Sequence, residues 1–200
     1  MWKWMCSKLS PRPYMGLNAS VIANYFIKRS IEDFALLTLP KLMALIYISQ
    51  GMSISYLRDP KGILGDEKLR AWGFGPVVKP LFHELKYTNC SPIRGYSQST
   101  VYENIEGFDS RPIFIEQIQM PKRTRVIKLL EQVWDNYMDY SHRELMEQIN
   151  VPGSPWEVAY HYNDTKIISN SRLNEAYAPI VRKILNNQSR QAKKISDLVP

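Results

Sequence analysis

The sequence predicts an all-α protein with one main domain and room for a small β-hairpin. An apolar-rich stretch from Leu42 to Ile48 suits a helix that runs through the middle of a domain. Apolar residues recur at three- and four-residue spacing from Lys122 to Tyr140, as on an amphipathic helix. The 200 residues are 44% hydrophobic and 12% aromatic, which is enough for a substantial core. We therefore expect six or seven helices, little sheet and no internal repeat.

Capping residues mark the first two helices. Asn18 or Ser20 can cap a first helix whose apolar side chains gather on one side. Thr38 and Pro40 begin the second helix, because the threonine can accept from free N–H groups and the proline lacks an N–H where none is required. Gly51 is expected to loosen this second helix.

The stretch LRAWGFGPVV, from Leu69 to Val78, predicts a corner in the chain. Residues 68–72 leave no room for a helix and suit an extended approach to a turn. Gly75 supplies backbone freedom before Pro76, whose preceding residue is biased away from the helical region. The proline also removes an N–H that a phosphate cradle would need, and no Lys-Ser/Thr pair follows, so a structural corner is favoured over an anion site. We expect Trp72 to be a core residue that fixes the corner.

A long polar stretch follows, from Lys86 to Pro112. Loops of this length are uncommon inside compact domains and are often functional. The segment STVYENI alternates weakly, which suggests the small hairpin within residues 88–118. The next segment, PIFIEQI at 112–118, suits either a short strand or a helical turn.

The remaining helices begin at recognisable signals. These are prolines suited to a first helical turn and polar N-caps, at Pro80, Ser141, Pro155 and Asn170 or Ser171. Glu144 completes the capping-box pattern Ser-x-x-Glu, and Pro179 is expected to kink the last helix.

The net charge of +7 is concentrated at the two ends of the chain. Residues 1–30 carry +5 and residues 179–200 carry +4, which leaves −2 for the centre. Basic ends can attract nucleic acid or an acidic protein surface, although a solvated tail is the commoner reason for them. The predicted organisation is an irregular basic segment at 1–17, a helical domain at 18–186 and a basic tail at 187–200.

No segment predicts a membrane span or a secretory signal. The longest apolar-rich run is far shorter than the roughly 20 residues that a bilayer requires. The N-terminus has no continuous apolar block. Cys6 and Cys90 lie far apart without ligand spacing, which fits a reducing compartment. We expect a cytoplasmic protein.

No catalytic, metal or cofactor set is recognisable, so we expect a protein that is not an enzyme. His83, His142 and His161 have no metal-ligand spacing, and no Gly-x-Ser-x-Gly elbow is present. Cys90 has no basic helix N-terminus beside it that would activate the thiol. The carboxylates of the long amphipathic helix fall on its solvent face. A hydrolase site assembled from distant segments stays a minor alternative.

The long polar stretch interleaves basic and aromatic residues that suit a partner contact: Arg94, Tyr96, Tyr102 and Arg111. Such a pattern can stack bases and hold phosphates. The same stretch contains three acids, which remove the electrostatic footprint of a nucleic-acid site. Tyr and Arg are also enriched at the anchoring points of protein interfaces, so a protein partner is favoured over nucleic acid.

Three separated motifs together resemble the Panacea domain, also known as the SocA-type antitoxin or phage-associated GepA family. TLPKLMALIYISQG, from Thr38 to Gly51, is similar to its signature helix; AWGFGPVV, from Ala71 to Val78, is similar to its second hallmark; and Pro155-Trp156 resembles a third. The resemblance covers roughly residues 18–184. The matching positions, which we assign to the scaffold, are Lys41, Leu42, Leu45, Tyr47, Gln50, Gly51, Ala71, Trp72, Gly75, Pro76, Val77, Pro155 and Trp156.

The resemblance implies an antitoxin that neutralises a toxin encoded beside it by direct protein–protein binding. In one branch of the family such a protein also presents its toxin to a protease, so a protease is a second implied partner. The chain departs from the family pattern at Pro40, Ala44 and Ile149-Asn150, where many members carry Leu, Lys and Thr-His. A catalytic or metal role for that histidine is therefore not carried over. The alternative function is a nucleic-acid-binding regulator of phage or mobile-element origin.

Overall fold

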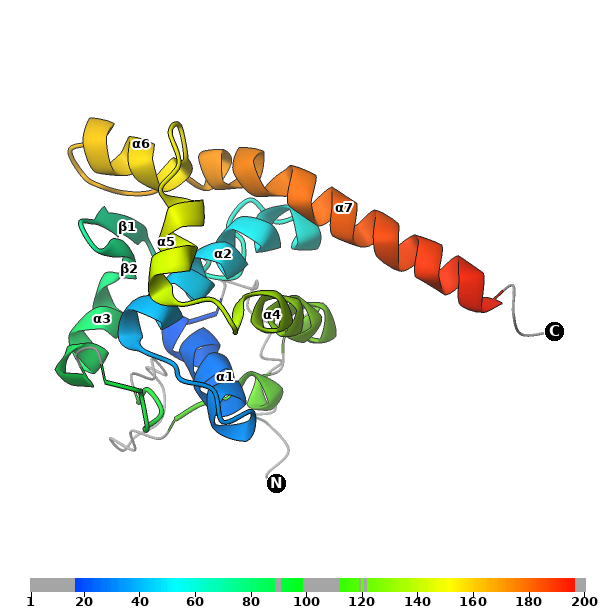
Figure 1. Cartoon of the computed structure of the whole chain (residues 1–200), viewed down its shortest axis with the longest axis horizontal. Helices are drawn as coiled ribbons and strands as arrows, with labels where there is room; N and C mark the ends of the chain where they lie inside the picture. The colour runs from blue at the N-terminus through cyan, green and yellow to red at the C-terminus, as the bar shows by residue number, and fades with distance from the viewer. Residues whose placement is uncertain (1–16, 89–90, 99–111, 119, 121, 197–200) are drawn as a thin grey trace, which may run out of the picture.

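The structure is a computed structural model that describes residues 17–88, 91–98, 112–118, 120 and 122–196, with side chains as far as residue 187. These residues form seven α-helices, two short 3₁₀ turns and one two-stranded antiparallel sheet (Figure 1). The elements are α1 (Ala19–Glu32), α2 (Leu39–Leu57), β1 (Leu69–Trp72), β2 (Gly75–Val78), α3 (Lys79–Leu85), η1 (Lys86–Thr88), η2 (Ile115–Gln117), α4 (Arg123–Tyr137), α5 (His142–Ile149), α6 (Pro155–Tyr162) and α7 (Asn170–Ser196). The predicted fold class, mainly helical with a small hairpin, is confirmed.

Helix α2 forms the centre of the fold. It is buried on nearly every side, as its continuous apolar run predicts, and it packs against α1, α4, α5, α7 and β2. The first half of α7 lies along α2, whereas its C-terminal half extends away from the body (Figure 1). Helix α7 continues to Ser196, beyond the predicted start of a tail at residue 187. Within the described part of the chain, no helix combines the length and apolar character needed to cross a bilayer.

The predicted helix starts are largely confirmed. The Asn18 side chain accepts a hydrogen bond from the Ser20 N–H at the start of α1. Ser141 and Glu144 form the predicted capping box of α5. Thr38 is the N-cap of α2, but its side chain makes no capping hydrogen bond, so that part of the prediction is wrong. Pro179 lies inside α7.

A hairpin lies at residues 69–78, where the sequence predicted a corner. Leu69 pairs with Val78 and Trp72 with Gly75, across a two-residue turn. Gly75 has φ +139°, a conformation that side chains rarely adopt, so the glycine allows the strand to leave the turn here. The described residues of the 88–118 region contain no strand, and PIFIEQI includes the 3₁₀ turn η2. STVYENI, at residues 99–105, lies outside the described part, so the hairpin suggested there stays a prediction.

The prediction that Trp72 is a fully buried core residue is wrong. Its side chain is half-buried and packs edge-on against Phe74 and Phe82, with ring centroids 5.8 and 5.1 Å apart. The strands are only four residues long, so Trp72 falls at the turn end of the hairpin, where one side of the ring faces solvent. Trp72 therefore belongs to a surface aromatic cluster and not to the central core.

Candidate protein-binding surface

Gln50 of the signature helix joins two distant segments to α2. Its amide nitrogen donates to the Lys61 carbonyl at 2.8 Å and to Asn170 Oδ1 at 3.1 Å, and its amide oxygen accepts from the Leu64 N–H at 3.0 Å. The side chain is almost completely buried. A buried amide with all of these partners fixes the loop after α2 and the start of α7, so its role is structural.

Gly51 and Tyr47 form the contact between α2 and α7. A Cβ built on Gly51 would lie 2.4 Å from Cδ2 of Tyr177, so only glycine lets the tyrosine ring approach α2 this closely. The Tyr177 and Tyr47 rings meet edge-to-face, with centroids 5.9 Å apart. Helix α2 is continuous through Gly51, which corrects the expectation that this residue loosens it.

The Tyr47 hydroxyl is held by two hydrogen bonds at the end of this contact. It accepts from the Trp156 backbone N–H and from the Tyr177 hydroxyl. Burial raises the pKa of both tyrosines well above the ordinary value, and the two donors act in the opposite direction on Tyr47. Both hydroxyls are therefore neutral and hydrogen-bonded to each other, which makes them poor candidates for proton transfer.

Lys41 caps the C-terminal end of α4. Its ammonium group donates to the Met138 carbonyl at the C-cap of that helix. A cation at this position interacts favourably with the helix dipole. Burial lowers the pKa of Lys41, while the nearby carboxylates of Asp139 and Glu144 act to raise it. The lysine thus links α2 to the α4–α5 junction.

The second and third motifs are also parts of the scaffold. Ala71, Pro76 and Val77 of the hairpin are buried, and the Ala71 N–H donates to the Lys166 carbonyl at 2.8 Å. Trp156 is buried at the start of α6 and stacks on Tyr160 at 5.0 Å. Of the thirteen positions assigned to the scaffold, all except Trp72 are buried.

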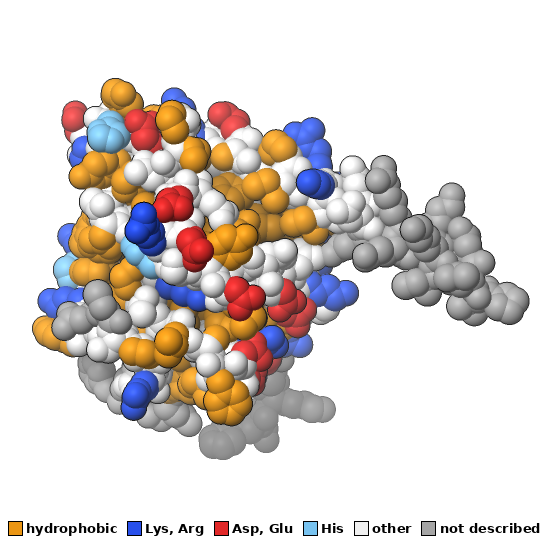
Figure 2. Space-filling view, viewed as in Figure 1, with side chains coloured by type: hydrophobic (Ala, Val, Ile, Leu, Met, Phe, Trp, Pro, Cys, Tyr) orange, Lys and Arg blue, Asp and Glu red, His pale blue; other side chains and the backbone are white. Residues whose placement is uncertain are grey.

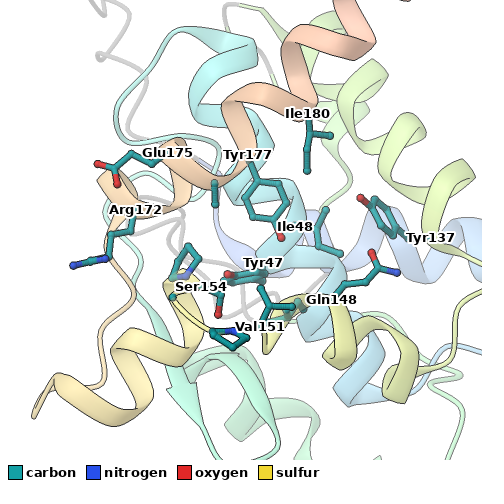
Figure 3. Close-up of a pocket in the computed structure, with 15 residues that line it drawn as sticks. Tyr47, Ile48, Tyr137, Gln148, Val151, Ser154, Arg172, Glu175, Tyr177 and Ile180 are labelled. Atoms are coloured by element: carbon teal, nitrogen blue, oxygen red, sulfur yellow. The ribbon is translucent and has the colours of Figure 1, made fainter.

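A pocket of about 480 Å³ lies above this scaffold, between α2, α7 and the loop that joins α5 to α6 (Figure 3). Tyr47, Ile48 and Tyr177 line it from α2 and α7, and Val151 and Ile180 are partly exposed within its lining. Its polar lining residues are Tyr137, Gln148, Ser154, Arg172 and Glu175. A pocket with this apolar lining suits one or two apolar side chains of a partner.

The polar side chains that line the pocket, among the described residues, come from Tyr, Gln, Ser, Arg and Glu. Its lining has no histidine or cysteine, and Ser154 is occupied as the N-cap of α6, accepting from the Glu157 N–H at 3.1 Å. Among the described residues, no three His, Cys, Asp or Glu side chains come together as metal ligands. His83, His142 and His161 lie on three different helices, α3, α5 and α6. The observed arrangement offers binding and positioning groups.

The residues predicted to contact a partner have separate environments. Arg94 is exposed, whereas Tyr96 is half-buried and packs edge-on against Phe114, with ring centroids 4.8 Å apart. The neighbouring Ser97 is buried and joined to α1: its N–H donates to Asn24 Oδ1 at 2.7 Å. Tyr102 and Arg111 lie outside the described residues. Of the four, Arg94 is therefore the one that is described and accessible.

A basic cluster at the start of α4 is already used within the fold. Lys122 donates to the Leu57 carbonyl at 2.8 Å, and Arg125 donates to the Tyr56 carbonyl, so both satisfy the C-terminal end of α2. Arg123 donates to carbonyls of the η2 segment at 3.1 and 3.2 Å. All three side chains stay exposed, so their charges remain accessible although some of their N–H groups serve the fold.

Comparison of the chain with models of known families, with curated proteins and with solved structures gave no significant match in any of the three.

Proposed function

We propose that this protein is an antitoxin, which neutralises a toxin encoded beside it by binding the toxin directly. The observation that carries the proposal is the ordered occurrence of the three motifs, Thr38–Gly51, Ala71–Val78 and Pro155-Trp156, which resemble the Panacea domain. One observation supports a binding role: apart from Trp72, the motif residues are buried within the packed body. Partner recognition then falls to the surface around them.

The chemistry of the pocket agrees with a binding role. Its two central tyrosine hydroxyls hydrogen-bond to each other, and its accessible lining is largely apolar. Such a surface gains affinity by excluding water from apolar side chains. We include a protease as a second partner in the proposal, with the antitoxin presenting the bound toxin for degradation.

Expression of the neighbouring gene with and without this protein tests the proposal. We expect growth to stop when the neighbour is induced alone and to recover when this protein is also produced. The matched control is the same gene with an early stop codon, because its transcript is retained while the protein is lost. A harmless neighbour, or recovery with the stop-codon control, contradicts neutralisation by the protein.

The adaptor part of the proposal has its own measurement. If the protein presents its toxin to a protease, the half-life of the toxin falls when both proteins are produced together. An unchanged half-life together with full growth recovery would show that the protein neutralises the toxin by binding alone, without a protease.

A further inference from the structure

The C-terminus of α1 has a phenylalanine where helices usually have glycine. The Ala35 N–H donates to the Ser30 carbonyl at 2.9 Å and the Phe34 N–H donates to the Ile31 carbonyl at 3.4 Å, the two hydrogen bonds of a Schellman motif. In this motif the residue at Phe34 must be left-handed, and its φ is +52°. Glycine is the usual residue here because a side chain strains this conformation.

The side chain at this strained position is almost completely exposed to solvent. Phe34 is 95% exposed, and Leu36 and Ile31 beside it are 73% and 47% exposed. We call these three residues the apolar knob. Because Phe34 has almost no packing within its own chain, burial does not compensate for the backbone strain. Strained residues of this kind occur at functional positions more often than elsewhere.

The apolar knob is held in place from both sides. The Asp33 carboxylate accepts from Trp134 Nε1 at 2.7 Å and pairs with Arg29 at 3.0 Å. After the knob, the Leu37 carbonyl accepts from the Ile93 N–H at 2.8 Å. Trp134 itself is fully buried and stacks on Phe26, so the anchor belongs to the core. A preformed loop of this kind loses little conformational entropy when it binds.

The surface around the knob carries more acids than bases. Glu32 lies between Ile31 and Phe34, and Glu131 and Asp135 are exposed on α4 beside Trp134, which bonds to the knob's neighbour Asp33. Figure 2 shows several acidic side chains over α4. Bases also lie nearby. Arg29 is paired with Asp33, Lys128 is exposed on α4 about 9 Å along the helix from Trp134, and Arg94 is exposed next to Ile93, which bonds to Leu37. The three exposed acids thus outnumber Lys128 and Arg94, the two bases outside that ion pair.

We propose that the apolar knob is the anchor by which this protein holds its toxin, and that the toxin offers an apolar pocket rimmed by Lys or Arg side chains. This inference rests on the proposed function. An exposed aromatic residue fits the pattern of interface hot spots, in which one side chain fills a pocket on the partner. The acidic surroundings require a basic rim, because like charges brought together would oppose binding.

A second copy of the chain fits the knob less well. The polar lining of the chain's own pocket includes both Arg172 and Glu175, so it does not present the basic rim that the acidic surroundings of the knob call for. A contact between the knob of one copy and the pocket of the next would also be head-to-tail, which leads to rings or open chains.

The chain offers a matched control for a test of the knob. Arg58 occupies the same position in the Schellman motif at the end of α2, with φ +54°, and it is exposed. Phe34→Gly and Arg58→Gly therefore relieve the same backbone strain at two helix ends, the first before α2 begins and the second where α2, a helix about 28 Å long, ends. Only the first removes the apolar knob.

Both variants, with the wild type, are tested for thermal unfolding and for binding to the purified toxin. We expect both substitutions to raise the melting temperature by about 2–4 °C. We expect Phe34→Gly to weaken toxin binding by about 30-fold or more, and Arg58→Gly to change it less than about twofold. Asp135→Lys should slow association with the toxin, because it places a cation opposite the proposed basic rim.

Four outcomes overturn the inference. If the wild type binds the toxin and Phe34→Gly binds equally well, the knob is not the anchor, although the proposed function stands. If the wild type does not bind the toxin, the proposed function and the inference fail together. A lower melting temperature for Phe34→Gly assigns Phe34 a packing role within the chain. Concentration-dependent self-association that Phe34→Gly abolishes makes a second copy the occupant.

Discussion

Gly51→Ala tests how α7 is attached to the body. The new methyl group would lie 2.4 Å from the Tyr177 ring, where ordinary contact needs 3.4 Å or more, so the ring must move by about 1 Å. Overpacking of this kind typically costs about 1–3 kcal/mol. The displaced ring also loses its hydrogen bond to Tyr47, worth about 1 kcal/mol, and its edge-to-face contact, worth about 0.5–1.5 kcal/mol.

One term favours the substitution, because alanine is about 1 kcal/mol better than glycine inside a helix. The net expectation is a loss of about 2–4 kcal/mol in the free energy of unfolding, or about 5–15 °C in melting temperature for a chain of this size. Urea denaturation followed by circular dichroism measures it. Gly95→Ala is the control, since a Cβ there meets nothing within 4 Å, and its effect should stay below about 0.5 kcal/mol.

The sign of the effect should reverse when the tyrosine ring is absent. In a Tyr177→Ala background the clash is gone, so Gly51→Ala should stabilise the protein by about 1 kcal/mol through helix propensity alone. If Gly51→Ala is equally destabilising in both backgrounds, the close approach of α7 is not the reason for the glycine.

Three further predictions concern the rest of the molecule. Tyr47→Phe leaves the Trp156 N–H without its acceptor and should cost about 1–3 kcal/mol in urea denaturation. Burial raises the pKa of Tyr25, Tyr47 and Tyr177 above 10.0, so the unfolded chain loses these protons at a lower pH than the folded protein does. The free energy of unfolding should therefore fall above about pH 10, by about 1.4 kcal/mol per pH unit for each tyrosine. Tyr47→Phe should make that slope shallower, and an unchanged slope contradicts the assignment. Trp72→Ala should cost about 1–2 kcal/mol, less than a fully buried tryptophan, and a loss above about 3 kcal/mol in guanidinium denaturation would place it in the core.

Much of the fold could be predicted because its signals are local. The Ser141–Glu144 capping box and the proline at the start of α6 depend on residues three or four apart. The central position of α2 follows from its apolar run, since a helix without a polar face has to be covered on all sides. The all-α class depends mainly on such features.

The features that were missed depend on residues far apart in the sequence. The pocket combines residues of α2, α7 and the α5–α6 loop, and no spacing in the sequence brings them together. The close approach of Tyr177 explains Gly51, but the sequence offered only the general effect of glycine on a helix. Nothing in the sequence marks Phe34 as left-handed either, because the usual sign of that conformation is glycine or asparagine.

The hairpin at residues 69–78 was missed for a different reason. Its strands are four residues long, too short for alternation to be recognised, and Gly75-Pro76 suggested an irregular corner. What stabilises the strands is pairing beyond the hairpin: the Ile168 N–H donates to the Leu69 carbonyl at 2.9 Å. That partner segment lies almost a hundred residues further along the chain.

Calorimetric titration of the purified protein with the product of the neighbouring gene tests the central claim most directly. We expect saturable binding with a fixed stoichiometry, and a complex in which the toxin has lost its activity while both chains remain chemically intact. The absence of binding at micromolar concentrations, or chemical modification of the toxin by catalytic amounts of this protein, would contradict a function based on docking.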